Sequence, residues 1–130
     1  MYSNADVSRL VQVHTNAQMY DIDQGSTRLP EIAKVPYLDV VGALNSSGTR
    51  LTLFCVNRHL TRDIGATIDV AGFRAILATA HSIFAGSIYE KNDENEPDRI
   101  HPQASSLPVG SPELRYSFRH ESVTVIEFDR

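Results

Sequence analysis

Alternation of apolar side chains with a period of two residues constrains the fold of this chain more than any other feature. In the stretch 50–57 both sides of the alternation are largely apolar: Leu51, Leu53 and Cys55 on one, Thr52, Phe54 and Val56 on the other. A strand with two apolar faces is typical of the centre of a sheet that is covered on both sides. The stretch 122–128, rich in β-branched residues, repeats the pattern near the end of the chain.

Weaker strand signals fill the remaining sequence at short intervals. We predict further strands at 10–15, 37–44, 66–70, 73–80 and 114–118, separated by turn signals at 23–26, 45–48 and 71–72. The turn Asn45–Gly48 lies between two apolar runs and predicts a hairpin loop, because Asn and Gly adopt positive φ at little cost. Many short strands with regular turns predict an all-β fold, an antiparallel β-sandwich with jelly-roll-like topology.

Two kinds of segment are less regular. Residues 75–84 are rich in Ala and Leu, which favours a helix, but the sandwich context leads us to expect a strand. We expect irregular connections at 22–35 and at 90–112. The second contains four prolines, at 97, 102, 108 and 112, and a proline cannot donate a hydrogen bond to a sheet.

Size and charge limit the classes of function. With 130 residues and no internal repeat, we expect one domain spanning residues 1–130. The net charge of −4 does not favour nucleic acid or an anionic membrane as a partner. No apolar run reaches 18 residues, so no membrane span is expected. The polar N-terminal segment 1–10 lacks the charged region followed by an apolar region that marks a signal peptide, which leads us to expect a cytoplasmic protein.

The motifs of common active sites are missing from the sequence. The five histidines lack metal-ligand spacing, and we expect His59 to anchor a turn. The acidic run 90–98 lacks the order of a calcium loop, and Cys55 in an apolar strand is typical of a buried thiol. No Gly-x-Ser-x-Gly, phosphate loop or spaced carboxylate pair occurs. We therefore expect no catalytic residue, no metal and no cofactor in this chain.

Four segments, in this order, resemble the C-terminal domain of glycoside hydrolase family 51 α-L-arabinofuranosidases. The segment 35–40 (Val-Pro-Tyr-Leu-Asp-Val) resembles the family's Val-Pro-x-Leu-Asp-Val strand opening, and 51–59 resembles its apolar strand ending in Val-Asn-Arg. The stretch 92–102 is similar to the family's Asn-x-x-x-x-Pro-x-x-Val-x-Pro loop, and 122–126 to its final strand. The motif positions are Asn57, Arg58, Asn92 and Pro97.

The resemblance implies a sandwich domain whose family partner is a (β/α)8 barrel that carries both catalytic glutamates. A barrel needs about 250 residues, so it lies outside this chain and no catalytic residue carries over. The implied role is to pack against and support a barrel that hydrolyses terminal arabinofuranosyl groups. Asn57, Arg58 and Asn92 would then tie strand ends and the long loop together through hydrogen bonds to the backbone.

Alternatives from other classes remain open. A carbohydrate-binding module that takes an arabinose-containing polysaccharide would present a row of exposed aromatic side chains, although the chain has no Trp. A module that docks a separate protein would expose an apolar patch, and an autonomous enzyme would need a cleft with converging polar groups. For a domain without its barrel, we expect self-association through the exposed barrel-facing surface.

Overall fold

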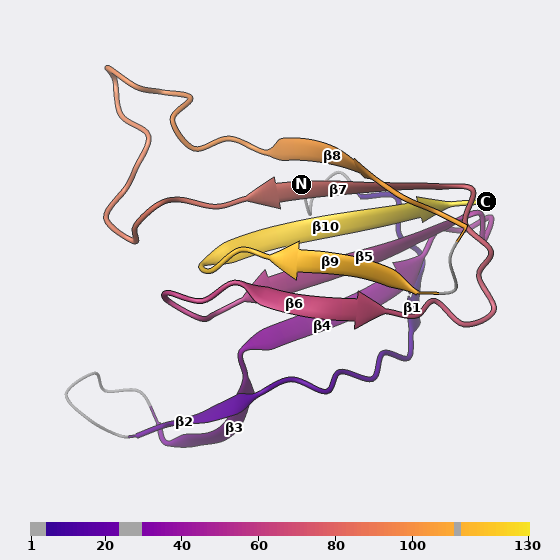
Figure 1. Ribbon diagram of the computed structural model, residues 1–130, viewed down its shortest axis with the longest axis horizontal. Helices are drawn as coiled ribbons and strands as arrows, with labels where there is room; N and C mark the ends of the chain where they lie inside the picture. Colours follow the sequence, from indigo (N-terminus) through magenta and orange to yellow (C-terminus); the bar gives the residue numbers. More distant parts are fainter. Residues whose placement is uncertain (1–4, 24–29, 111–112) are drawn as a thin grey trace.

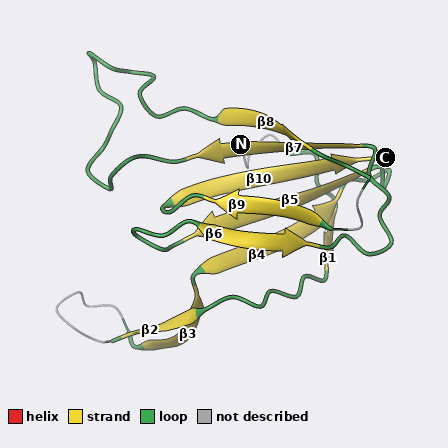
Figure 2. Ribbon diagram, in the orientation of Figure 1, coloured by secondary structure: helices red, strands yellow, loops and turns green. Residues whose placement is uncertain are grey.

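Strands form all of the regular secondary structure in the part of the chain that the computed structural model describes, residues 5–23, 30–110 and 113–130 (Figures 1 and 2). They are β1 (Arg9–Val11), β2 (Met19–Ile22), β3 (Ile32–Pro36), β4 (Leu38–Leu44), β5 (Arg50–Asn57), β6 (Ile64–Ile68), β7 (Leu77–Ile83), β8 (Gln103–Leu107), β9 (Leu114–Phe118) and β10 (Ser122–Asp129). These residues include no helix that could cross a membrane.

The strands form one large antiparallel sheet and two ribbons. The large sheet has the order β1-β4-β5-β10-β7-β8, and the ribbons are β2–β3 and β6–β9. In Figure 1 the β6–β9 ribbon lies across the front of β5 and β10, whereas β2–β3 extends from the lower end of β4. The chain passes from the sheet to the ribbon at β6, back at β7, and repeats this at β9 and β10. The predicted all-β antiparallel sandwich is confirmed.

The core lies between the large sheet and the β6–β9 ribbon. Phe118 and Leu114 of β9 pack in one cluster with side chains from one face of the sheet: Leu38, Leu51, Leu53, Cys55, Ala78, Ala80, Ile126 and Phe128. The short side chains of β7, Ala78 and Ala80, are fully buried, and this alternation explains why residues 77–83 form a strand despite their helix propensity. Tyr116 joins the ribbon to the sheet through its hydroxyl, 2.9 Å from Ser82 Oγ.

The predicted hairpin between β4 and β5 forms as expected. The Asn45 side-chain oxygen accepts hydrogen bonds from the backbone N–H groups of Thr49 and Arg50, both at 3.0 Å. Gly48 has a φ of 70°, a conformation that glycine adopts without steric cost. The predicted turn at 71–72 is also present, with Gly72 at φ 78°. The turn predicted at 23–26 extends outside the described residues.

The structure corrects several predicted boundaries. The strand predicted at 10–15 ends at Val11, β6 begins two residues before the predicted 66, and β7 begins at Leu77 rather than at 73. The connections predicted as irregular contain β3 and β8. β8 is a polar, exposed edge strand bounded by Pro102 and Pro108, so the prolines flank the strand and do not interrupt its hydrogen bonds.

Candidate functional site

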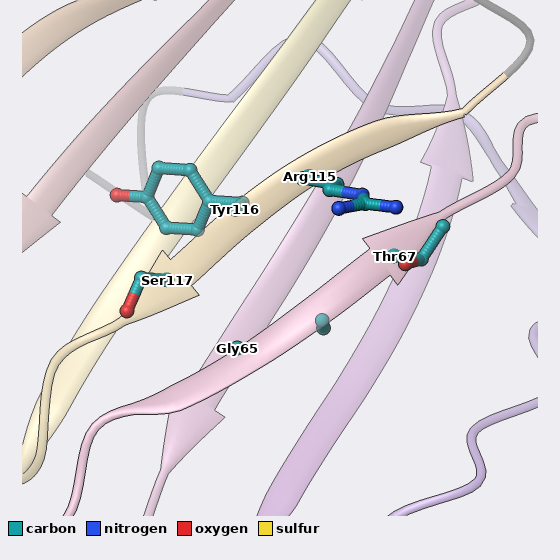
Figure 3. A pocket seen from close by; sticks show the side chains of 6 residues that line it. Gly65, Thr67, Arg115, Tyr116 and Ser117 are labelled. Carbon is teal, nitrogen blue, oxygen red and sulfur yellow. The ribbon is translucent and has the colours of Figure 1, made fainter.

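A shallow hollow of about 430 Å³ lies on the β6–β9 ribbon (Figure 3). It is lined by Gly65, Ala66 and Thr67 of β6 and Arg115, Tyr116 and Ser117 of β9. Gly65 leaves open space where another residue would place a side chain. No carboxylate lines the hollow, and the Tyr116 hydroxyl already contacts Ser82. The hollow therefore offers no acid–base pair for hydrolysis.

Two carboxylates on the large sheet, those of Glu127 and Asp129, contact the same arginine. Arg50 Nε lies 2.7 Å from Asp129 Oδ1, Arg50 Nη1 lies 3.4 Å from Glu127 Oε1, and Glu127 Oε2 lies 3.8 Å from His81 Nε2. The hydrogen bond with Asp129 raises the pKa of Arg50 above its ordinary value. A retaining glycosidase needs one carboxyl group free as an acid and another free as a nucleophile, and this cluster supplies neither.

Asn57 ties together three segments at one end of the sandwich. Its side chain is 1% exposed, and its amide nitrogen lies 3.0 Å from the carbonyl oxygens of Phe118 and Arg119 and 3.2 Å from that of Arg62. Its amide oxygen accepts a hydrogen bond from the His59 N–H at 2.9 Å. One side chain thus holds the end of β5, the loop before β6 and the end of β9.

Arg58 and His59 extend these connections. Arg58 donates to the Pro36 carbonyl at 3.0 Å and to the Asp39 carboxylate at 2.7 Å. His59 Nδ1 accepts hydrogen bonds from the backbone N–H groups of Thr61 and Arg62, so this histidine anchors a turn. Its ring lies 4.8 Å from that of Tyr37, which stacks on Tyr20 at 4.5 Å. No local sequence pattern predicts this aromatic stack, because only the pairing of β2 with β3 brings Tyr20 and Tyr37 together.

Asn92 closes the long loop between β7 and β8. Its side chain donates to the Ile100 carbonyl at 2.8 Å and accepts from the Ile100 N–H at 2.7 Å. Asp93 accepts two backbone hydrogen bonds, from Asn95 and Glu96, which lower the pKa of its carboxyl. Pro97 is exposed within this loop. Among the described residues, no hydrogen bond joins this loop to Asn57 or Arg58.

The face of the large sheet that points away from the β6–β9 ribbon is also apolar; we call it the outer face. Two rows of residues cross it in register: Val41–Phe54–Val125–His81 and Asp39–Val56–Val123–Ile83. In the described part of the chain, the core cluster takes none of its members from these rows. Val41 is 49% exposed and Leu10 on the adjoining edge strand is 75% exposed, whereas Val125, Ala43 and Thr52 on the same face are at most 4% exposed. The outer face is the candidate contact surface.

The thiol of Cys55 is expected to be inert in the folded protein. Cys55 is 1% exposed, and burial raises its pKa to about 12. The thiolate is the reactive form, so native protein at pH 8 should react with a disulfide reagent such as dithionitrobenzoate only after unfolding in urea. The raised pKa also means that stability falls as the pH rises above about 8.5, because the unfolded chain then loses a proton that the folded chain retains. Rapid labelling without urea would contradict this prediction.

The chain is similar to known proteins in its three-dimensional structure. No protein-family model matches the chain, and no curated protein sequence matches it. The structure is similar to the family 51 α-L-arabinofuranosidase of Thermotoga petrophila RKU-1, with a TM-score of 0.86 and 21% identity over 98% of this chain and 27% of that enzyme. The α-L-arabinofuranosidase of Thermotoga maritima gives a TM-score of 0.83 and 22% identity over 93% of this chain and 26% of the enzyme.

A more distant likeness extends to another glycosidase family. The family 44 xyloglucanase of Paenibacillus polymyxa matches with a TM-score of 0.55 and 16% identity over 72% of this chain and 17% of that enzyme. In each case this chain spans only about a quarter of the enzyme or less. The resemblance inferred from the sequence is confirmed for the fold. This chain has the fold of one part of a family 51 α-L-arabinofuranosidase, and that part makes up about a quarter of the enzyme.

Proposed function

We propose that this chain is the non-catalytic C-terminal sandwich domain of an α-L-arabinofuranosidase-like glycoside hydrolase. In this proposal it packs against a (β/α)8 catalytic barrel, keeps it rigid, and leaves the hydrolysis of terminal arabinofuranosyl groups to the barrel. One observation carries the proposal: almost the whole chain superposes on arabinofuranosidases, but on only about a quarter of their length. The remaining three quarters leave ample length for a barrel of about 250 residues.

The chemistry of the described side chains supports a role without catalysis. The carboxylates of Glu127 and Asp129 are paired with Arg50. No group of three potential metal ligands comes together among the described residues. The bonds of Asn57 and Arg58 join strand ends to loops, which suits a domain whose task is to present a fixed surface.

The size of the natural protein tests this proposal directly. An antibody raised against this chain should detect, in an extract of the source cells, a polypeptide roughly four times as long as the chain. Protein isolated with that antibody should release arabinose from an aryl α-L-arabinofuranoside, whereas the purified 130-residue chain should not. Detection of the short chain alone, without associated arabinofuranosidase activity, would refute the proposal.

Sugar binding is the second candidate function, and a titration separates it from the first. We expect amide chemical shifts of the purified chain to stay constant during titration with arabinoxylan and arabino-oligosaccharides up to millimolar concentration. Tyr89→Ala, which removes an aromatic side chain that is 86% exposed and therefore available to stack on a sugar ring, should give the same constant chemical shifts. Saturable shifts clustered on one surface, and lost in a variant of that surface, would replace the supporting role with a sugar-binding one.

A further inference from the structure

We propose that His59 and Arg62, in the loop that follows β5, form a binding site for a carboxylate group. The inference concerns side chains of this chain alone and does not rest on the proposed function. It follows from three properties of the pair: two hydrogen-bond donors that face each other, an arginine charge that no described carboxylate neutralises, and a rigid surround.

The hydrogen bonds of the His59 ring fix which nitrogen carries its proton. Nδ1 lies 3.1 Å from the backbone nitrogen of Thr61 and 3.0 Å from that of Arg62, and both N–H groups donate to it. A ring nitrogen that accepts hydrogen bonds carries no proton, so the N–H of the ring must be at the other nitrogen. The ring therefore carries its proton on Nε2, which makes Nε2 a donor.

The Nε2–H group of His59 meets a second donor. Arg62 Nε lies 2.8 Å from His59 Nε2, and the Nε–H group of an arginine can only donate. Two N–H groups at this distance repel each other, because neither nitrogen offers a lone pair to the other. An oxygen atom that enters beside them has two lone pairs, accepts from both groups and relieves the repulsion. The geometry of the pair therefore fits an oxygen acceptor.

The charge of Arg62 favours a carboxylate oxygen over that of water. Within the described ranges 5–23, 30–110 and 113–130, no carboxylate forms an ion pair with Arg62. The nearby carboxylates of Asp39 and Asp63 contact Arg58 and His120 instead, at 2.7 and 2.8 Å. Hydrogen bonds from a guanidinium to an anion are shorter and stronger than those to a neutral oxygen.

Both side chains are held in place before a ligand binds. The His59 ring lies 4.8 Å from the ring of Tyr37, and its backbone N–H donates to Asn57 Oδ1 at 2.9 Å. The Arg62 carbonyl accepts from Asn57 Nδ2 at 3.2 Å, and Arg62 Nη2 donates to Gln18 Oε1 at 3.1 Å. Donors that are already ordered lose little freedom on binding. His59 is half-buried and Arg62 is exposed, so a ligand reaches the pair from solvent.

The ligand is defined by its carboxylate, which a free organic acid or an aspartate or glutamate side chain of another protein supplies. A few hydrogen bonds to one group at the surface outweigh the entropy lost on association only narrowly. The dissociation constant for a single carboxylate should therefore be in the millimolar range.

Nuclear magnetic resonance of the complete chain at about pH 7.5 tests the inference with two probes, sodium acetate and a blocked tripeptide with a central aspartate. Both should shift the Nε–H signal of Arg62 and the ring signals of His59 saturably, whereas sodium chloride at the same ionic strength should not. Binding of the tripeptide at least about tenfold tighter than acetate assigns the site to a protein side chain, and comparable or weaker binding assigns it to a free acid. The nitrogen shifts of His59 should identify the Nε2–H tautomer.

Three variants make the test specific, with binding followed at the His59 ring. Arg62→Gln removes the charge and the Nε–H group and should weaken acetate binding at least about tenfold. Arg62→Lys keeps the charge but not the planar N–H groups and should weaken it several-fold. Arg115→Gln, at an exposed arginine of β9, is the matched control and should bind like the wild type.

Backbone amide spectra of each variant separate a lost site from a lost fold. Absence of saturation up to about 100 mM acetate, an equal effect of chloride, or a proton on Nδ1 of His59 would overturn the inference. So would acetate binding that Arg62→Gln or Arg62→Lys retains in full, or that Arg115→Gln removes equally well. None of these outcomes bears on the proposed function, whose tests measure the size of the natural protein and its activity on sugars.

Discussion

Replacement of Asn57 by alanine is expected to lower the free energy of unfolding by about 3–4 kcal/mol. The side chain is 1% exposed and bonds to the carbonyl groups of Arg62, Phe118 and Arg119 and to the N–H of His59. Alanine leaves these groups without their partner in a buried site, where an unsatisfied polar group costs about 1–3 kcal/mol. Urea denaturation followed by circular dichroism gives the difference, which is large against a total stability of about 5–15 kcal/mol.

Two further variants make this prediction specific. Asn57→Asp keeps the oxygen that accepts from His59 but turns a second oxygen, in place of the amide nitrogen, toward the three carbonyl groups. The folded state then favours the protonated acid, so the carboxyl pKa rises above its unfolded value of about 3.9 and stability is lost as the pH increases. The variant should be less destabilised at pH 4 than at pH 7. Asn95→Ala, in the exposed long loop, is the control and should change stability by less than about 0.5 kcal/mol. A loss below about 1 kcal/mol in Asn57→Ala would show that water replaces these bonds.

The strands that the sequence predicted best are those with strong local signals. The strand at 50–57 and that at 114–118 have the predicted bounds, because apolar alternation and turn residues define both ends. β2, β3 and β8 were not predicted, because their local sequence signals are weak. Gln103–Leu107 is polar and exposed, and it is a strand only because the edge of β7 offers hydrogen bonds to it. In β3, Lys34 has a φ of 58° and its N–H bonds to the Asp21 side chain, which no local pattern indicates.

Side-chain contacts could be predicted from the sequence only where they are local. The turn around His59 involves residues two and three positions away, and the sequence context of a strand end is enough to suggest it. The bonds of Asn57 to Phe118 and Arg119 span 61 and 62 residues, so they depend on how β9 crosses the sheet. The outer face also could not be predicted from local sequence. The alternation shows that β5 has two apolar faces, but only the topology shows that the β6–β9 ribbon covers one of them.

Replacement of Phe118 by alanine should lower the free energy of unfolding by about 4 kcal/mol, because Phe118 is the largest fully buried side chain that the β6–β9 ribbon contributes to the core in the described part of the chain. It is 1% exposed, belongs to the core cluster, and packs edge-to-face on Tyr116 with the ring centroids 4.8 Å apart. A two-stranded ribbon is marginally stable alone, so its position depends on such contacts. In a domain of this size the loss should lower the melting temperature by roughly 15 °C, measured by differential scanning calorimetry.

Phe118→Leu and Tyr89→Ala distinguish loss of packing from loss of aromatic area in general. Leucine refills much of the cavity and should cost about 1–1.5 kcal/mol, whereas removal of the Tyr89 ring, which is 86% exposed, should cost less than about 0.5 kcal/mol. If Phe118→Ala and Tyr89→Ala lowered the melting temperature equally, the ribbon would not depend on Phe118. We expect the melting temperature to be lowest for Phe118→Ala, higher for Phe118→Leu and highest for Tyr89→Ala. This order follows because the volume left empty at position 118 determines how much stabilising contact between ribbon and sheet is lost.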